Sequence, residues 1–235
     1  MFKRRNKNQS NLLQKSWKNG IKEKEWAKEI YSDGRYKSLG LFVSVYSQVR
    51  EVIKTSPRNI LEIGIGGGAT SVFLKNLGYN LTTCDFNKNL SPDFVADIRE
   101  LPFKDNSFDT VLACEILEHI PYTDVSLALK ELSRITRKRI IVSVPRAHLS
   151  CGFLVRLDIP FFSKLIKGSF GIPYSFFTSR GEHESHPGHY WAIGRRGYSK
   201  KRFKNLLKNY FKIEDCFIED LNSTHIFFIL EPLRK

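Results

Sequence analysis

The stretch Ile60-Leu-Glu-Ile-Gly-Ile-Gly-Gly-Gly-Ala-Thr70 decides the fold of this chain of 235 residues. Its first four residues are aliphatic apart from Glu62, which is the pattern of a short buried strand. Four glycines follow within five residues, and residues from about 68 to 77 have helical spacing. A glycine turn lets the backbone approach a ligand because no Cβ intervenes, and a helix N-terminus offers free N–H groups. The stretch therefore predicts a cradle for a nucleotide-type cofactor.

Strands and helices alternate along the rest of the chain. The expected strands are residues 59–63, 80–84, 93–96, 108–114, 139–144, 211–218 and 225–231, and the expected helices are residues 68–77, 123–137 and 198–209. This alternation is typical of crossover units that build a parallel sheet with helices on both faces. Only residues 219–224 separate the last two strands, which indicates an antiparallel hairpin. We expect an α/β fold: a Rossmann-like, doubly wound, mostly parallel seven-stranded sheet with an antiparallel last strand.

Two segments do not fit the alternation of the main domain, which is expected over residues 58–235. Residues 1–57 are predicted to form a basic N-terminal tail and helices, because apolar residues with helical spacing are interrupted by Gly34 and Gly40. Residues from about 146 to 190 show no strand–helix repeat and are rich in Phe. A long irregular segment in a compact domain is often a binding element, so a lid or substrate insertion is expected after the fifth strand.

Charge and cysteine content restrict the partners and the compartment. The net charge is +14, and the flanks carry it: residues 1–58 have 14 Lys/Arg and 5 Asp/Glu, whereas residues 59–145 have 9 and 11. An acidic substrate, an anionic membrane surface or RNA would suit such flanks. No apolar run is long enough to span a membrane, and the basic N-terminus lacks the apolar part of a secretory signal. Four cysteines without a C-x-x-C pair predict reduced thiols and a cytoplasmic location, with peripheral membrane contact as the alternative.

The glycine motif alone does not identify the cofactor. Gly64-x-Gly66-x-x-Ala69 also satisfies the dinucleotide pattern, so a NAD-dependent oxidoreductase is an alternative. Asp85 follows the second expected strand, where an acid accepts the two ribose hydroxyls of either cofactor class. Further along come Asp97-Ile98, then the block from Leu101-Pro-Phe to Asn-Ser-Phe-Asp109, and then Cys114 to Pro121 after the fourth strand.

In this order the motifs resemble those of class I S-adenosylmethionine-dependent methyltransferases, in particular their small-molecule type 11 branch. The E-x-G-x-G-x-G motif of that class matches Glu62, Gly64, Gly66 and Gly68, the Leu-Pro-Phe…Asp-x-Ser-Phe-Asp block matches residues 101–109, and Leu-Glu-His matches residues 117–119. His189-Tyr-Trp-Ala-Ile-Gly194 is similar to an H-Y-W motif of some relatives. The resemblance covers residues 60–145 and extends through the final hairpin.

The resemblance implies S-adenosylmethionine as cofactor and a role for each matching residue. Glu62 would orient the loop or meet the ammonium group, Asp85 would hold the ribose diol, Phe86 would cover the adenine, and Asp97 would accept from its amine. The full set of expected cofactor contacts is Glu62, Gly64, Ile65, Gly66, Gly68, Asp85, Phe86, Asp97, Ile98 and Cys114.

The acceptor side is less defined by the sequence. His119 is the only core histidine expected at the cofactor edge of the sheet, which makes it the candidate base, although a packing role is an alternative. His189 and Tyr190 are candidate substrate residues. No metal site is expected, because Pro187-Gly188 interrupts the spacing of His183, His186 and His189. A small, lipid-like or acidic acceptor is expected. The alternatives are an RNA methyltransferase and a basic RNA-binding module that no longer catalyses.

Overall fold

The computed structural model describes residues 38–159, 162–173 and 188–234. The α-helices are α2 (Leu39–Ile53), α3 (Ala69–Asn76), α4 (Val125–Ile135) and α5 (Lys200–Leu207), and the short 3-10 helices are η3 (Lys88–Leu90) and η4 (Leu117–His119). The strands are β1 (Ile60–Ile63), β2 (Leu81–Asp85), β3 (Phe94–Val95), β4 (Phe108–Cys114), β5 (Thr136–Pro145), β6 (His148–Ile159), β7 (Phe162–Pro173), β8 (Phe211–Glu219) and β9 (Asn222–Pro232).

Seven of these strands form one sheet in the order β3-β2-β1-β4-β5-β9-β8. The pairs β1–β2, β1–β4, β2–β3 and β4–β5 are parallel. Strand β9 is antiparallel to both β5 and β8. The expected fold is confirmed, because the sheet is mostly parallel and ends in the antiparallel hairpin predicted for the C-terminus. The parallel strands place the glycine loop and the residues after β4 at one carboxyl edge.

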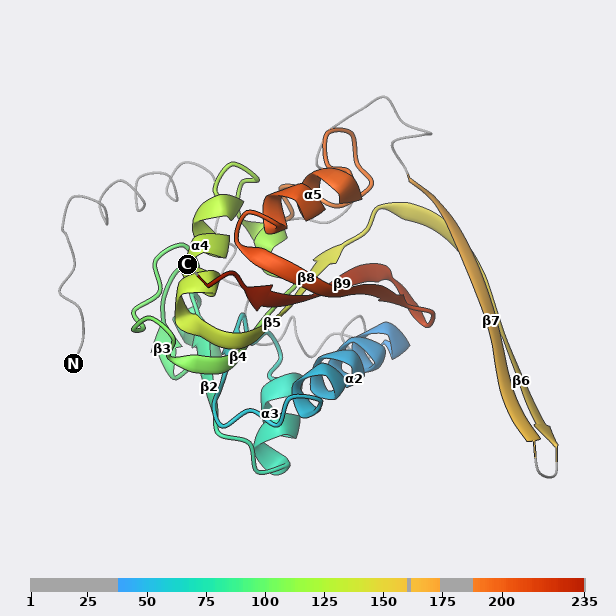
Figure 1. The fold of residues 1–235 in the computed structure, drawn as a ribbon, viewed down its shortest axis with the longest axis horizontal. Helices are drawn as coiled ribbons and strands as arrows, with labels where there is room; N and C mark the ends of the chain where they lie inside the picture. The colour runs from blue at the N-terminus through green and yellow to red at the C-terminus, as the bar shows by residue number, and fades with distance from the viewer. Residues whose placement is uncertain (1–37, 160–161, 174–187, 235) are drawn as a thin grey trace.

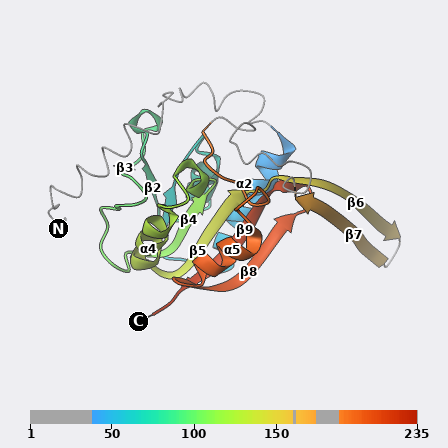
Figure 2. The same cartoon turned by 90° about the horizontal axis from the view of Figure 1, so that it is seen from above.

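Helices cover both faces of the sheet, with α4 and α5 on one face and α2 and α3 on the other (Figures 1 and 2). Alternate residues of a strand therefore enter two different cores. In β4, Val111 and Ala113 pack in the core with α4, whereas Leu112 packs in the core with α2 and α3. Burial on both faces explains why the central strands are continuous apolar runs.

Local sequence explains where the helices begin. The Ser38 hydroxyl accepts a hydrogen bond from the N–H of Leu41 at 3.3 Å, which caps α2. The Ser199 hydroxyl caps α5 in the same way, through the N–H of Arg202 at 3.1 Å. Helix α2 forms the second half of the helical region expected over residues 22–54. The first half, with the rest of the basic tail, lies outside the described residues.

The Phe-rich insertion contains regular structure that the sequence analysis did not predict. Strands β6 and β7 pair antiparallel from His148↔Pro173 to Ile159↔Phe162 and form a separate two-stranded sheet. The hairpin projects away from the main sheet in both views (Figures 1 and 2). It occupies the position expected for the insertion after the fifth strand. Residues 174–187 of the insertion lie outside the described residues.

Two observations bear on the expectations about membrane spans and cysteine pairing. Within the described residues, no helix combines the length and the hydropathy that a membrane span requires. Cys84, Cys114 and Cys216 are free thiols, and the fourth cysteine, Cys151, belongs to β6.

Candidate active site

The glycine loop connects β1 to α3 with a backbone that requires glycine. Gly64, Gly66 and Gly68 have φ values of 77°, 50° and 76°, in the left-handed region that side chains disfavour. A Cβ added at Gly64 would also overlap the side chain of Ile116, which follows β4. The N–H of Gly64 donates to the carbonyl of Cys84 at 2.8 Å. The loop is therefore packed closely between the ends of β2 and β4.

Asp85, at the end of β2, holds this loop through hydrogen bonds to its backbone. Its Oδ2 accepts from the N–H of Ile65 and its Oδ1 accepts from the N–H of Asn87, both at 2.9 Å. Burial raises the pKa of Asp85, and the backbone hydrogen bonds oppose that rise. A carboxylate offers about four acceptor positions, so Asp85 can still accept from a further donor beyond its backbone hydrogen bonds with Asn87, Ile65 and Phe86.

Glu62 lies beneath the loop in a buried position on β1. Its side chain is 5% exposed, and its Oε2 has no hydrogen-bond partner among the described residues. Burial raises the pKa of Glu62 to about 8, although Ser71 and Lys75 oppose the rise. A buried carboxylate oxygen without a partner is costly, so this atom is suited to receive a donor from a ligand.

The other expected cofactor residues lie in different environments. Phe86 is 48% exposed beside Asp85. Asp97 forms an ion pair with Arg99, in which its two oxygens accept from Nε at 3.1 Å and Oδ2 accepts from Nη2 at 2.7 Å. A further donor to Asp97 must therefore compete with this guanidinium. Ile98 is part of the hydrophobic core, and the half-buried Cys114 thiol lies 3.7 Å from the carbonyl oxygen of Ile141.

The Leu-Glu-His turn and the His-Tyr-Trp segment are joined by three hydrogen bonds. The N–H of Tyr190 donates to the Glu118 carbonyl at 2.8 Å, and the Trp191 indole donates to the Leu117 carbonyl at 3.1 Å. The His119 Nδ1 lies 3.1 Å from the carbonyl oxygen of Gly188. These contacts bring together His119, His189 and Tyr190, the residues predicted for the acceptor side.

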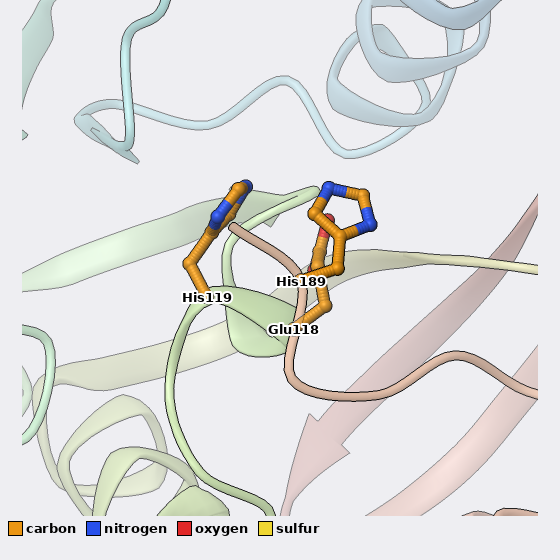
Figure 3. Close-up of side chains that lie close together, drawn as sticks. All are labelled: Glu118, His119 and His189. Atoms are coloured by element: carbon orange, nitrogen blue, oxygen red, sulfur yellow. The ribbon is translucent and has the colours of Figure 1, made fainter. Parts of the chain in front are cut away.

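The contact between His119 and Gly188 defines the tautomer of the neutral imidazole. A carbonyl oxygen can only accept, so Nδ1 carries the proton and Nε2 keeps its lone pair. Burial lowers the pKa of His119, which favours the neutral ring, while the bond to Gly188 opposes the effect. The rings of His119 and His189 are 4.8 Å apart at 88° (Figure 3).

Glu118, the middle residue of the Leu-Glu-His turn, was not among the predicted site residues. It is fully buried, and neither carboxylate oxygen has a hydrogen-bond partner among the described residues. Burial and the nearby Glu115 raise its pKa well above the usual range. The Leu-Glu-His motif contained Glu118, but the sequence alone did not indicate that its side chain turns inward.

His225 corrects the expectation that His119 is the only core histidine at this edge. His225 pairs with Pro145 at the end of β5, and its Nε2 lies 3.3 Å from Oε2 of Glu115. Glu115 has a φ of 55°, an unusual value for a residue other than glycine. Its Oε1 also accepts from the Ser143 hydroxyl at 2.8 Å, so neighbouring groups hold Glu115 in place.

Comparisons with known proteins agree with this architecture. Residues 61–142 match the family model described as a methyltransferase domain. An uncharacterized protein of Methanocaldococcus jannaschii is 37% identical over 100 residues, which covers 38% of this chain and 42% of that protein. The match therefore spans less than half of that relative's length.

Two solved structures share the fold at low identity. The N-methyltransferase NodS from Bradyrhizobium japonicum, in complex with S-adenosylhomocysteine, has a TM-score of 0.55 at 11% identity, covering 84% of this chain and 89% of its own. The magnesium protoporphyrin IX methyltransferase of Synechocystis, also with S-adenosylhomocysteine, has a TM-score of 0.56 at 16% identity, covering 83% and 84%. The comparisons agree with the predicted class: residues 61–142 match a methyltransferase-domain model, and the fold is the one shared by these S-adenosylmethionine-dependent methyltransferases.

Proposed function

We propose that this protein transfers a methyl group from S-adenosylmethionine to an acceptor bound beside His119. One observation carries the proposal. The glycine loop, with Glu62 and Asp85, lies at the same edge of the sheet as the Leu-Glu-His turn and the His-Tyr-Trp segment that is hydrogen-bonded to it. In open α/β sheets, ligands bind at this carboxyl edge. A cofactor cradle and a candidate acceptor site therefore lie next to each other.

The residues of the cradle fit S-adenosylmethionine. The unpartnered Oε2 of Glu62 suits the ammonium group, and the acceptor capacity that Asp85 keeps beyond its backbone hydrogen bonds suits the ribose diol. The exposed ring of Phe86 is available to an adenine face. S-adenosylmethionine has no pyrophosphate, so the buried acid Glu62 beside the loop suits it better than a dinucleotide, whereas Asp85 would suit the ribose of either cofactor.

The chemistry needs little from the protein beyond position and a proton acceptor. When bound, S-adenosylmethionine would supply a methyl carbon activated by its sulfonium for transfer to a lone pair of the acceptor. The residues around His119 would hold the acceptor in that line and exclude water. Nε2 of His119 would take the proton that a hydroxyl or ammonium acceptor loses.

A lipid-like or acidic acceptor is the finer part of the proposal. The inserted segment contains Phe153, Phe161, Phe162, Phe170, Phe176 and Phe177 in sequence, together with several basic residues. Such a composition suits an amphipathic molecule with a negative group, and contact with an anionic membrane surface. The basic flanks also support the alternative of an RNA acceptor.

Transfer from methyl-labelled S-adenosylmethionine tests this function. The protein is incubated separately with a lipid extract, a small-metabolite extract and total RNA, and label is measured in each product. We expect label in the lipid or small-metabolite product. Label in RNA would replace the acceptor proposal. If protein that binds S-adenosylmethionine labels none of the extracts, this result would contradict methyl transfer. It would favour the alternative of a basic RNA-binding module that no longer catalyses. Membrane contact is tested separately by sedimentation of the protein with anionic vesicles at low salt. If the protein does not bind these vesicles, contact with an anionic membrane surface is excluded.

A further inference from the structure

Three potential metal ligands converge where the Leu-Glu-His turn meets the His-Tyr-Trp segment. Glu118, His119 and His189 each offer a ligand atom, and these atoms all lie within 4.8 Å of one another. All three side chains point in the same direction (Figure 3). Two imidazoles and one carboxylate are a common ligand set for divalent transition metals, including catalytic zinc.

The buried carboxylate gives independent evidence for a ligand. Glu118 is 0% exposed, and both of its oxygens have no hydrogen-bond partner among the described residues. Buried carboxylates are normally paired, hydrogen-bonded or bound to a metal. A cation between Glu118 and the two imidazoles would supply the missing partner for this group.

His119 has the hydrogen bond that a metal-binding histidine usually needs. Its Nδ1 donates to the Gly188 carbonyl at 3.1 Å, which fixes the tautomer and leaves the Nε2 lone pair for coordination. Histidine ligands in metal sites commonly donate their other ring nitrogen to a carbonyl or carboxylate in this way.

The backbone around the three residues is already fixed. Two hydrogen bonds hold the backbone beside His189 against the turn. The N–H of Tyr190 donates to the Glu118 carbonyl, and the indole N–H of Trp191 donates to the Leu117 carbonyl. In a tetrahedral zinc site, ligand atoms about 2.0–2.1 Å from the ion lie about 3.3 Å from each other. The three ligand atoms lie within 4.8 Å of one another in the structure. Rotation of the side chains that moves these atoms by roughly an ångström or two would therefore complete the site.

We propose that Glu118, His119 and His189 bind one divalent transition-metal ion of the zinc type, with at least one coordination position open to water or another ligand. This proposal differs from the expectation of no metal, which rested on Pro187-Gly188 interrupting the spacing of the sequence-adjacent histidines and did not bring Glu118 and His119 together with His189. The site does not depend on methyl transfer. Because the ion would occupy the Nε2 lone pair, the metal-bound state and the His119 base are alternative states of the same cluster.

Cobalt binding tests the site in the full chain, because Co²⁺ occupies zinc sites and absorbs visible light. We expect one Co²⁺ per chain, the visible bands of a four- or five-coordinate ion, and displacement by Zn²⁺. His189→Ala should weaken binding by at least 100-fold or so, since even outer partners of metal ligands contribute roughly 10–100-fold. Glu118→Gln should have the same effect while keeping the side-chain shape. Circular dichroism checks that each variant is folded.

Two controls make the result specific. His225→Ala removes a histidine outside the cluster, and the double variant His183→Ala/His186→Ala removes the other histidines near His189 in sequence; both should bind Co²⁺ as the unmodified chain does. Loss of binding in the double variant but not in Glu118→Gln would overturn the assignment. An absence of stoichiometric Co²⁺ binding would also overturn it. S-adenosylmethionine titration of the same samples tests the proposed function separately.

Discussion

The carboxylate of Asp85 accepts a hydrogen bond from the backbone N–H of Ile65 at 2.9 Å. This bond connects the end of β2 to the glycine loop after β1, 20 residues earlier in the chain. Asp85 thus shapes the cradle before any ligand arrives, and the proposed ribose contact would use the lone pairs that remain. Loop geometry and cofactor affinity should therefore change together when this side chain is altered.

Asp85→Asn should weaken S-adenosylmethionine binding by about 1–3 kcal/mol, because the amide removes a charged acceptor and points a donor at a backbone N–H. Calorimetric titration measures the change. Asp93→Asn is the matched control: Asp93 also accepts two hydrogen bonds, from the N–H and hydroxyl of Thr83, but lies outside the loop. Equal affinity losses in both variants would refute a specific role for Asp85.

Gly64→Ala should abolish detectable cofactor binding and lower the free energy of unfolding, because the new Cβ overlaps Ile116 in a strained conformation. Gly78→Ala is the control, since Gly78 has a similar φ of 83° but no heavy atom within 4 Å of the new Cβ. The control should lose about 1 kcal/mol of stability and bind normally. Chemical denaturation and titration distinguish the two variants, and normal binding by Gly64→Ala would disprove the close packing of the loop.

Proton release should accompany cofactor binding below about pH 8. The pKa of Glu62 is raised to about 8, so at pH 7 the free carboxyl is mostly protonated, whereas an ammonium ligand favours its ionised form. Affinity should therefore rise with pH up to about 8. Calorimetry at pH 7 in buffers of different ionisation enthalpy measures the released proton, which Glu62→Gln should eliminate. Identical binding enthalpies in all buffers would contradict the Glu62–ammonium contact.

His119→Ala should leave S-adenosylmethionine affinity nearly unchanged and slow methyl transfer about 100-fold or more. The reason is that Nε2 of His119 is the candidate proton acceptor, whereas the cradle lies on other elements. His225→Ala, at the same edge but bound to Glu115, should retain a near-normal rate. Single-turnover kinetics with an acceptor found in the methyl-labelling experiment provide the comparison. A near-normal rate for His119→Ala would reduce His119 to a packing residue.

The sequence predicted the main sheet well because its strands are buried on both faces. Strand β4 was predicted at its observed bounds, since its apolar run has no polar interruption except Asp109 and Thr110 near its start. The β6–β7 hairpin was missed because Gly152, Gly168 and Gly171 are poor strand formers, so its composition resembles a loop. Its strands pair with each other as a separate sheet, outside the alternation of strands and helices that builds the main sheet.

The candidate site was predicted in parts rather than as an assembly. The motifs of His119 and His189 were each identified, but their contact depends on hydrogen bonds such as His119 to Gly188, 69 residues away. Only the fold brings these segments together and turns Glu118 inward. The cradle was easier to predict because Glu62 and Gly64 are only two residues apart in sequence, and Asp85 ends the next strand.

Calorimetric titration of the purified protein with S-adenosylmethionine, S-adenosylhomocysteine and NAD(H) tests the central claim most directly. We predict that both adenosylated ligands bind with dissociation constants of micromolar order, and that NAD(H) does not bind. A folded sample that binds neither adenosylated ligand, or that binds NAD(H) instead, would contradict the assignment of the glycine loop, Glu62 and Asp85 to S-adenosylmethionine.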